Sequence, residues 1–264
     1  MIQKCHIRKP QKRLREMNDN PLKYKVFLSS GYMAFSRHCA FLQGISELSL
    51  GVSSVTGTSS GAIVGALYCA GHSPEFILNE IASVNIFKSV SLWPLQRSGL
   101  FSLEPAKKYL RRYLPADFDS LAVTFSCGVV GKEKNHLLID KGDLISAVCA
   151  SFAVPGLFRP VEIAGIPGGP FQDGGVEDRI GLYDRMVTGD ILTDEEYLLH
   201  IINKSHRASS QNNYDFMFDA YKNIRVFRSA AANTSLFGPK KYRYQYEFSL
   251  SRLKESLRNS VGKS

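Results

Sequence analysis

The sequence has no long apolar run. No stretch approaches the roughly 20 apolar residues that a helix needs to cross a bilayer. The first residues, MIQKCHIRKPQKRLREMNDNP, are basic and polar and do not contain the apolar core of a secretory signal. We therefore expect an intracellular protein that is cytoplasmic or peripherally attached to a membrane.

Cysteine is also sparse, and its spacing carries no metal or redox motif. The count of five is odd, and no CxxC pair or Cys/His metal spacing occurs. Cys39, Cys69 and Cys149 lie in apolar or small-residue stretches, where free thiols usually act as small hydrophobic groups. We expect reduced thiols, a reducing compartment, and neither a metal nor another cofactor.

Acidic residues are fewer than basic ones. The chain has 33 Lys and Arg against 24 Asp and Glu, a net charge of +9. Basic clusters at both ends could contact anionic lipid headgroups, worth about 1 kcal/mol per residue, or could be a solvated arm. No nucleic-acid-binding motif is present, so nucleic acid is not an expected partner. These basic residues are Lys4, Arg8, Lys9, Lys12, Arg13 and Arg15 at the start and Lys240, Lys241, Arg243, Arg252, Lys254, Arg258 and Lys263 at the end.

Strand-like and helix-like segments alternate along the chain, which is typical of an α/β fold. Their alternation predicts a three-layer α/β/α sandwich with a mostly parallel central sheet. The expected strands are 25–29, 53–56, 121–130, 136–139, 161–163, 170–172, 198–202 and 224–228. The expected helices are 34–48, 59–70, one from 74, 106–113 and 143–151.

The domain organisation is expected to be simple. Residues 1–23 are interpreted as a basic flexible arm and residues 24–264 as one domain, although no motif covers the part beyond about residue 185. Residues 88–121 are irregular and proline-containing, which suggests an insertion or lid. Trp93 and Phe101, near the start of that region, could line an acyl pocket, touch a membrane, or simply pack in the core.

A glycine-bordered serine follows the second expected strand. Gly57-Thr58-Ser59-Ser60-Gly61 matches G-x-S-x-G, the sharp strand-to-helix turn that lifts a nucleophilic serine out of a sheet. Glycine at both borders removes the Cβ atoms that would collide there. Ser59 is the expected nucleophile, and Ser60 is expected to point into the helix. The alternative is a turn without chemistry.

A serine hydroxyl needs a basic partner to react at neutral pH. Asp173 ends an expected strand, and Gly174 and Gly175 behind it would let another segment approach, although an ordinary Asp-Gly turn would have the same sequence. His200 and His206 are the other choices and would complete a Ser-Asp-His order. His200, however, lies in an apolar run and His206 in a polar loop.

Three segments together resemble the patatin-like phospholipase family. They are VTGTSSGAIVGALYCAG at 55–71, AVCASFAVPGLFRPVEIAG at 147–165 and FQDGG at 171–175. The resemblance extends over roughly Lys25 to Tyr183. It implies a Ser59–Asp173 dyad without histidine, an acyl-enzyme intermediate, and phospholipids or other glycerolipids as substrates. A catalytically weakened lipid- or partner-binding relative and an acyltransferase are the alternatives.

Two segments depart from the family pattern. The oxyanion loop of the family usually reads G-G-G-x-R/K-G, whereas this chain keeps only Gly31 and has Ala34 in place of the basic residue. We expect the backbone N–H groups of Gly31 and Tyr32 to form the oxyanion hole. After the Asp-Gly-Gly motif, the Asn and Pro that are common in the family are replaced within 176–180, VEDRI.

Overall fold

The structure is a computed structural model, and it describes residues 23–83, 101–188, 191, 194–203, 218, 220–231 and 240–261. The expected basic arm lies outside these residues except for Lys23, which begins the first strand. The proposed lid is described only from Phe101 onward, so Trp93 lies outside the described part.

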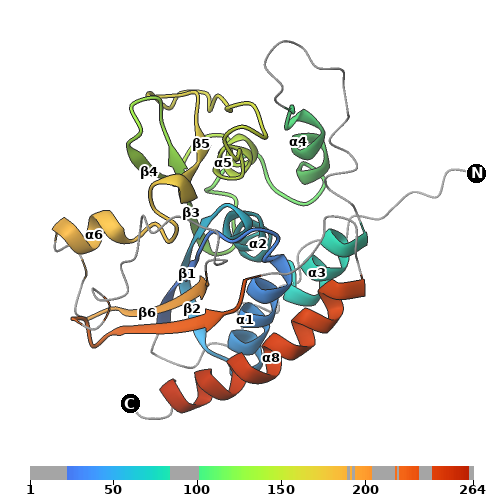
Figure 1. The fold of residues 1–264 in the computed structure, drawn as a ribbon, viewed down its shortest axis with the longest axis vertical. Helices are drawn as coiled ribbons and strands as arrows, with labels where there is room; N and C mark the ends of the chain where they lie inside the picture. Colours follow the sequence, from blue (N-terminus) through green and yellow to red (C-terminus); the bar gives the residue numbers. More distant parts are fainter. Residues whose placement is uncertain are drawn as a thin grey trace, which may run out of the picture.

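The described residues form a mixed sheet that is mostly parallel, as predicted (Figure 1). The spatial order is β4-β3-β2-β1-β6-β7, with β5 also paired to β3. Only β4 and β5 run antiparallel to their neighbour β3. The strands are β1 (Lys23–Leu28), β2 (Gly51–Thr58), β3 (Thr124–Val130), β4 (His136–Ile139), β5 (Gln172–Asp173), β6 (Glu196–Ile202) and β7 (Ile224–Ser229).

Helices flank the sheet on both faces, so the three-layer prediction is confirmed. Side chains alternate along β1: Val26 and Leu28 join the large core, whereas Phe27 joins a smaller core with Met186 on the other face. None of the helices in the described part is long and apolar enough to cross a bilayer. The helices are α1 (Phe35–Glu47), α2 (Ser60–Cys69), α3 (Pro74–Ser83), α4 (Glu104–Leu110), α5 (Leu144–Ser151), α6 (Tyr183–Thr188) and α8 (Lys240–Val261), with a 3₁₀ turn at Gly174–Val176.

One expected strand was wrong. Residues 161–163 make only an isolated bridge, in which Val161 pairs with Phe171. Three glycines and two prolines lie between these two residues and disfavour strand pairing, so the paired length is limited to that bridge. The last strand of the motif, β5, consequently begins two residues later than expected and ends on Asp173.

The basic C-terminal segment is a packed helix and not a solvated arm. Tyr246 and Leu257 of α8 are buried against α1. Gly44 of α1 provides room for this contact, because a Cβ there would lie 3.0 Å from Leu257 Cδ1. Two of the basic residues are partly neutralised, since Arg243 pairs with Glu75 and Lys254 with Glu47.

We predict that Leu257→Ala lowers the free energy of unfolding by about 2–5 kcal/mol, because it opens a cavity under α8. Urea unfolding measures this change. Ser256→Ala, on the exposed side of the same helix, is the control and should change the value by less than about 0.5 kcal/mol. Equal stability of the two variants would contradict a packed α8.

Candidate active site

Ser59 stands between a strand and a helix, as the sequence predicts. β2 ends at Thr58 and α2 begins at Ser60. The Ser59 backbone has φ 56° and ψ −115°, a region that residues with a Cβ rarely adopt. Such a conformation costs about 1–3 kcal/mol and persists only where surrounding contacts enforce it. The turn therefore holds a strained residue at the N-terminus of α2.

The two bordering glycines are needed because backbones meet there. A Cβ on Gly57 would lie 2.5 Å from the Gly61 carbonyl oxygen. A Cβ on Gly61 would overlap the backbone of Leu28 at the end of β1. Both distances are shorter than real Cβ contacts, so no larger residue fits without moving the helix away from the sheet. The expected reason for the G-x-S-x-G spacing is confirmed.

Neighbouring groups fix the strand-to-helix turn at Ser59, called the elbow below. The Ser59 N–H donates to Ser151 Oγ at 3.0 Å, from the C-terminal end of α5. The Ser60 hydroxyl donates to the Gly31 carbonyl oxygen at 2.7 Å. The prediction that Ser60 points into its own helix was wrong. The Ser60 hydroxyl instead reaches the carbonyl of the loop after β1. Ser151 lies in segment 147–165, one of the three segments singled out in the sequence. The position of Ser151 in that segment did not predict its contact with Ser59.

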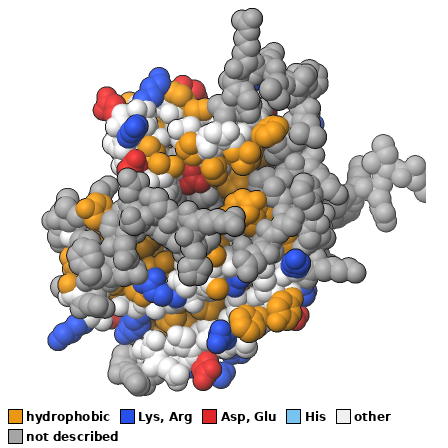
Figure 2. All heavy atoms as spheres, in the orientation of Figure 1, with side chains coloured by type: hydrophobic (Ala, Val, Ile, Leu, Met, Phe, Trp, Pro, Cys, Tyr) orange, Lys and Arg blue, Asp and Glu red, His pale blue; other side chains and the backbone are white. Residues whose placement is uncertain are grey.

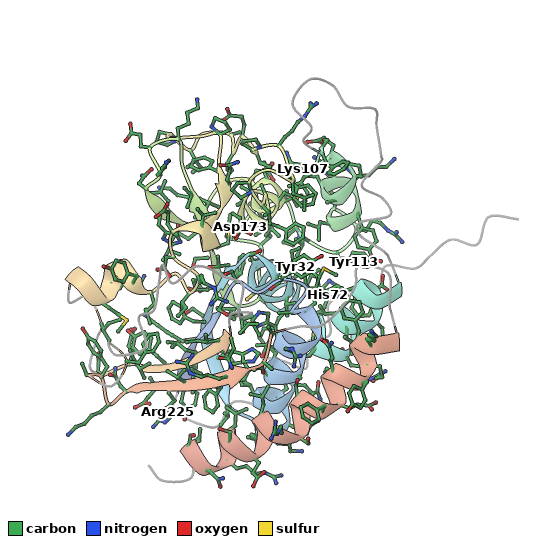
Figure 3. All side chains as sticks on the ribbon, viewed as in Figure 1. Tyr32, His72, Lys107, Tyr113, Asp173 and Arg225 are labelled. Atoms are coloured by element: carbon green, nitrogen blue, oxygen red, sulfur yellow. The ribbon has the colours of Figure 1, made fainter. Side chains whose placement is uncertain are left out.

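Asp173 is the last residue of β5 (Figure 3) and lies near Ser59. Its carboxylate accepts a hydrogen bond from the Gly175 N–H at 2.8 Å. Burial raises the pKa of Asp173 to about 6, and the nearby Ser59 hydroxyl, the Gly175 N–H and the Arg179 charge oppose this effect. The carboxylate is therefore ionised at neutral pH and is more basic than an exposed aspartate.

The glycines behind Asp173 also allow close approach. A Cβ on Gly174 would overlap the backbone of Gly128 in β3, and one on Gly175 would lie 2.6 Å from Ser30 Oγ. The turn is thus pressed against both the sheet and the loop that follows β1. This contact joins the carboxylate segment to the expected oxyanion loop.

The histidines lie elsewhere. His200 is buried in β6, with Nδ1 2.9 Å from Nδ1 of His38 and Nε2 2.9 Å from Ser229 Oγ. Burial lowers the pKa of His200 and of His38, so both rings are neutral. These contacts make His200 a hydrogen-bonded core residue. His206 lies outside the described residues.

The loop after β1 forms a turn beside the elbow. The Gly31 carbonyl accepts from the Ala34 N–H at 3.2 Å in addition to Ser60. The Tyr32 side chain is 64% exposed, and Met33 has a φ of 54° with its side chain buried. Across the described residues, the N–H groups of Gly31 and Tyr32 have no hydrogen-bond acceptor. The added side chains of Tyr32 and Met33 thus make no hydrogen bond to these two N–H groups, which stay the predicted oxyanion donors.

An apolar cavity lies close to the elbow, between α2, α4 and α5. Ile63 lies one helical turn after Ser59, and Phe152 follows Ser151. Hydrophobic side chains also gather around a recessed acidic group on the face in Figure 2. The cavity is apolar but holds only about 10 Å³, the space of roughly one water-sized group. The described part of the chain contains no cluster of three or more metal-ligating side chains. The remaining cavity residues are Ala106, Tyr109, Leu110, Val148 and Cys149.

Comparisons with known proteins agree with this geometry. The family model described as patatin-like phospholipase matches residues 26–184. Uncharacterized NTE family proteins of Mycobacterium bovis and Mycobacterium tuberculosis are 24% identical over 175 residues, which is 62% of this chain and 46% of each relative. The chain thus spans about half the length of these relatives.

Two solved structures share the fold. VipD from Legionella pneumophila has a TM-score of 0.53 at 12% identity. The match covers 91% of this chain and 67% of the VipD chain. ExoU, in its heterodimeric complex with SpcU from the type III secretion system of Pseudomonas aeruginosa, has a TM-score of 0.51 at 14% identity. That match covers 92% of this chain and 52% of the other.

We predict that Ser59→Gly is more stable than Ser59→Ala by about 1 kcal/mol, because only glycine adopts the observed backbone without strain. Both changes remove the hydroxyl, so their difference isolates the backbone. Chemical unfolding of both variants measures it. At Ser60, a helical position, the order should reverse, since alanine is the better helix former. A more stable Ser59→Ala variant would show that the turn is unstrained.

Proposed function

Because this chain belongs to the patatin-like phospholipase family, we propose that it hydrolyses carboxylic ester bonds of phospholipids or other glycerolipids. Ser59 is the nucleophile and Asp173 the base in this proposal. The observation that carries it is the proximity of the strained Ser59 to the buried Asp173 carboxylate, whose pKa the Ser59 hydroxyl lowers. Both residues lie within the matched region, and we treat residues 24–264 as one acyl-hydrolase domain.

Acylation begins when Ser59 Oγ attacks the ester carbonyl carbon and Asp173 takes the hydroxyl proton. The carbonyl oxygen becomes an oxyanion that accepts from the N–H groups of Gly31 and Tyr32. The N-terminus of α2, on which Ser59 stands, adds a favourable field. When the intermediate collapses, the leaving alcohol receives the proton from Asp173, and the acyl group stays on Ser59.

Deacylation repeats these steps with water. Asp173 takes a proton from the water as its oxygen attacks the acyl carbon, and the second intermediate expels Ser59 Oγ. The proton returns to Ser59, and a fatty acid leaves.

A dyad is chemically sufficient because Asp173 is buried. Burial raises the pKa of this carboxyl to about 6, so it binds a proton more readily than an exposed carboxylate and is still ionised at pH 7. His200 is hydrogen-bonded within the core and is neutral, and it takes no part in the proposed steps. The serine is therefore activated by a single, more basic carboxylate.

Lipid substrates lie in membranes, and we propose peripheral contact with anionic lipid through the basic termini. On α8, Tyr244 and Phe248 are exposed and their rings stack at 6.3 Å. Arg252 lies over the Phe248 ring at 5.0 Å. Exposed aromatic and basic side chains on one helix suit the interface between headgroups and acyl chains.

A screen of lipid classes tests the proposal. We predict that the wild-type protein releases fatty acid from at least one glycerolipid and that Ser59→Ala and Asp173→Asn each lower kcat by a factor on the order of 10⁴. His206→Ala, and folded His200→Ala, should keep most of the activity. Adding an alcohol acceptor reports any acyl transfer as a new ester. Full activity of Asp173→Asn, or loss of activity in a folded histidine variant, would contradict the dyad.

We also predict an acidic limb in the pH dependence of kcat/KM near pH 6. The base must be ionised, so activity falls as the pH drops through the pKa of Asp173, about 6. Initial rates between pH 4.5 and 8 on a soluble ester give the midpoint. A midpoint at the ordinary value for an exposed aspartate, about 4, would mean that Asp173 is not the group that titrates.

A further inference from the structure

Arg179 joins the segment after Asp173 to the loop after β1. Its Nη2 donates to the Ser30 carbonyl oxygen at 2.9 Å and to the Ile202 carbonyl oxygen at 2.8 Å, and its Nε lies 3.2 Å from Ser30 Oγ. The Arg179 carbonyl in turn accepts from the Ser30 N–H at 2.6 Å. Ser30 is thus held at its N–H, its carbonyl and its hydroxyl by one residue.

The contact with the Ser30 carbonyl bears directly on the expected oxyanion hole. The Ser30 carbonyl and the Gly31 N–H belong to one planar peptide unit, in which they point in opposite directions. Fixing the carbonyl therefore fixes the direction of the Gly31 N–H. Ser29 Oγ donates to the same carbonyl at 3.1 Å, so two donors set this peptide plane.

The guanidinium also strengthens that donor. A charged donor makes a shorter and stronger hydrogen bond than a neutral one. Hydrogen bonds in a chain polarise one another, so a carbonyl that accepts from a cation leaves its own peptide N–H more positive. The next peptide is held similarly, since the Gly31 carbonyl accepts from Ser60 Oγ and from the Ala34 N–H.

We propose that Arg179 is the positioning residue of the oxyanion hole, which aims and polarises the Gly31 N–H toward the substrate carbonyl oxygen. The inference rests on the proposed function. It also accounts for both departures from the family pattern: Ala34 leaves the loop without its usual basic residue, and Arg179 brings a cation to the same loop from the segment that follows the Asp-Gly-Gly motif.

The same cation acts on the base. The charge of Arg179 lowers the pKa of Asp173 and so opposes the effect of burial. Removing the charge should therefore raise the pKa of Asp173 and move the acidic limb of the pH profile upward. The limb thus reports the charge of Arg179 at Asp173, whereas kcat reports its hold on the Ser30–Gly31 peptide.

Three variants test the proposal on the esterase reaction: Arg179→Gln, Arg179→Lys and, as a matched control, Arg159→Gln, which removes a charge from an exposed position. We expect Arg179→Gln to lower kcat about 10- to 100-fold, within the effect of losing one oxyanion donor, with KM little changed and the acidic limb shifted upward. Arg179→Lys keeps the charge but not the fork of donors, so its acidic limb should stay in place while kcat still falls.

Folded Arg179→Gln with wild-type kcat would overturn the proposal, whether or not the acidic limb moves. If Arg179→Gln does not fold, Arg179→Lys decides, and wild-type kcat in that variant would overturn it equally. A loss of kcat in Arg159→Gln of the same size would also count against a specific role of Arg179. These outcomes are distinct from failure of the proposed function, in which the wild-type protein would show no hydrolysis that depends on Ser59.

Discussion

Backbone contacts too close for a Cβ atom hold the site together. α2 is pressed onto the end of β1 at Gly61, and the turn after Asp173 is pressed onto β3 at Gly174. These contacts bring Ser59 and Asp173, which are separated by more than a hundred positions in the sequence, close enough for the hydroxyl to lower the pKa of the carboxyl. The strained backbone of Ser59 persists because the contacts around it cannot relax independently.

Polar groups around Ser59 and Asp173 link three segments: the turn at Ser59, the segment after β5 and the loop after β1. Asp173 lies near Ser59. The segment that follows Asp173 contains Arg179, which donates a hydrogen bond to the Ser30 carbonyl. Ser60, next to the nucleophile, binds the Gly31 carbonyl of the same loop. The proposed oxyanion loop is therefore coupled to the proposed nucleophile turn through Ser60 and to the proposed base segment through Arg179, so a shift of one segment would affect the others.

The sequence predicted the features that depend on local pattern. The strand, turn and helix around Ser59 follow from glycine spacing and from the apolar residues on each side, and the structure has them. The pairing of Ser59 with Asp173 came from the family resemblance, because no local pattern specifies which distant segment meets a turn. The sheet class followed from the alternation of elements.

Other features depend on tertiary packing and were not predictable. Of the 22 residues in α8, 14 are charged or polar, so its apolar stripe is hard to recognise from the sequence pattern alone. Arg179 lies in a stretch that the sequence marked only as a departure. Its role in the loop depends on where β1 and β6 end, since its partners include Ser30 and Ile202.

The central claim is that a carboxylate alone activates the hydroxyl of Ser59. The most direct measurement is reaction of the folded protein with a fluorophosphonate, followed by peptide mapping by mass spectrometry. The account predicts a single adduct on Ser59 that is nearly absent from Asp173→Asn. No adduct on the folded wild-type protein, an adduct on another serine, or undiminished labelling of Asp173→Asn would contradict it.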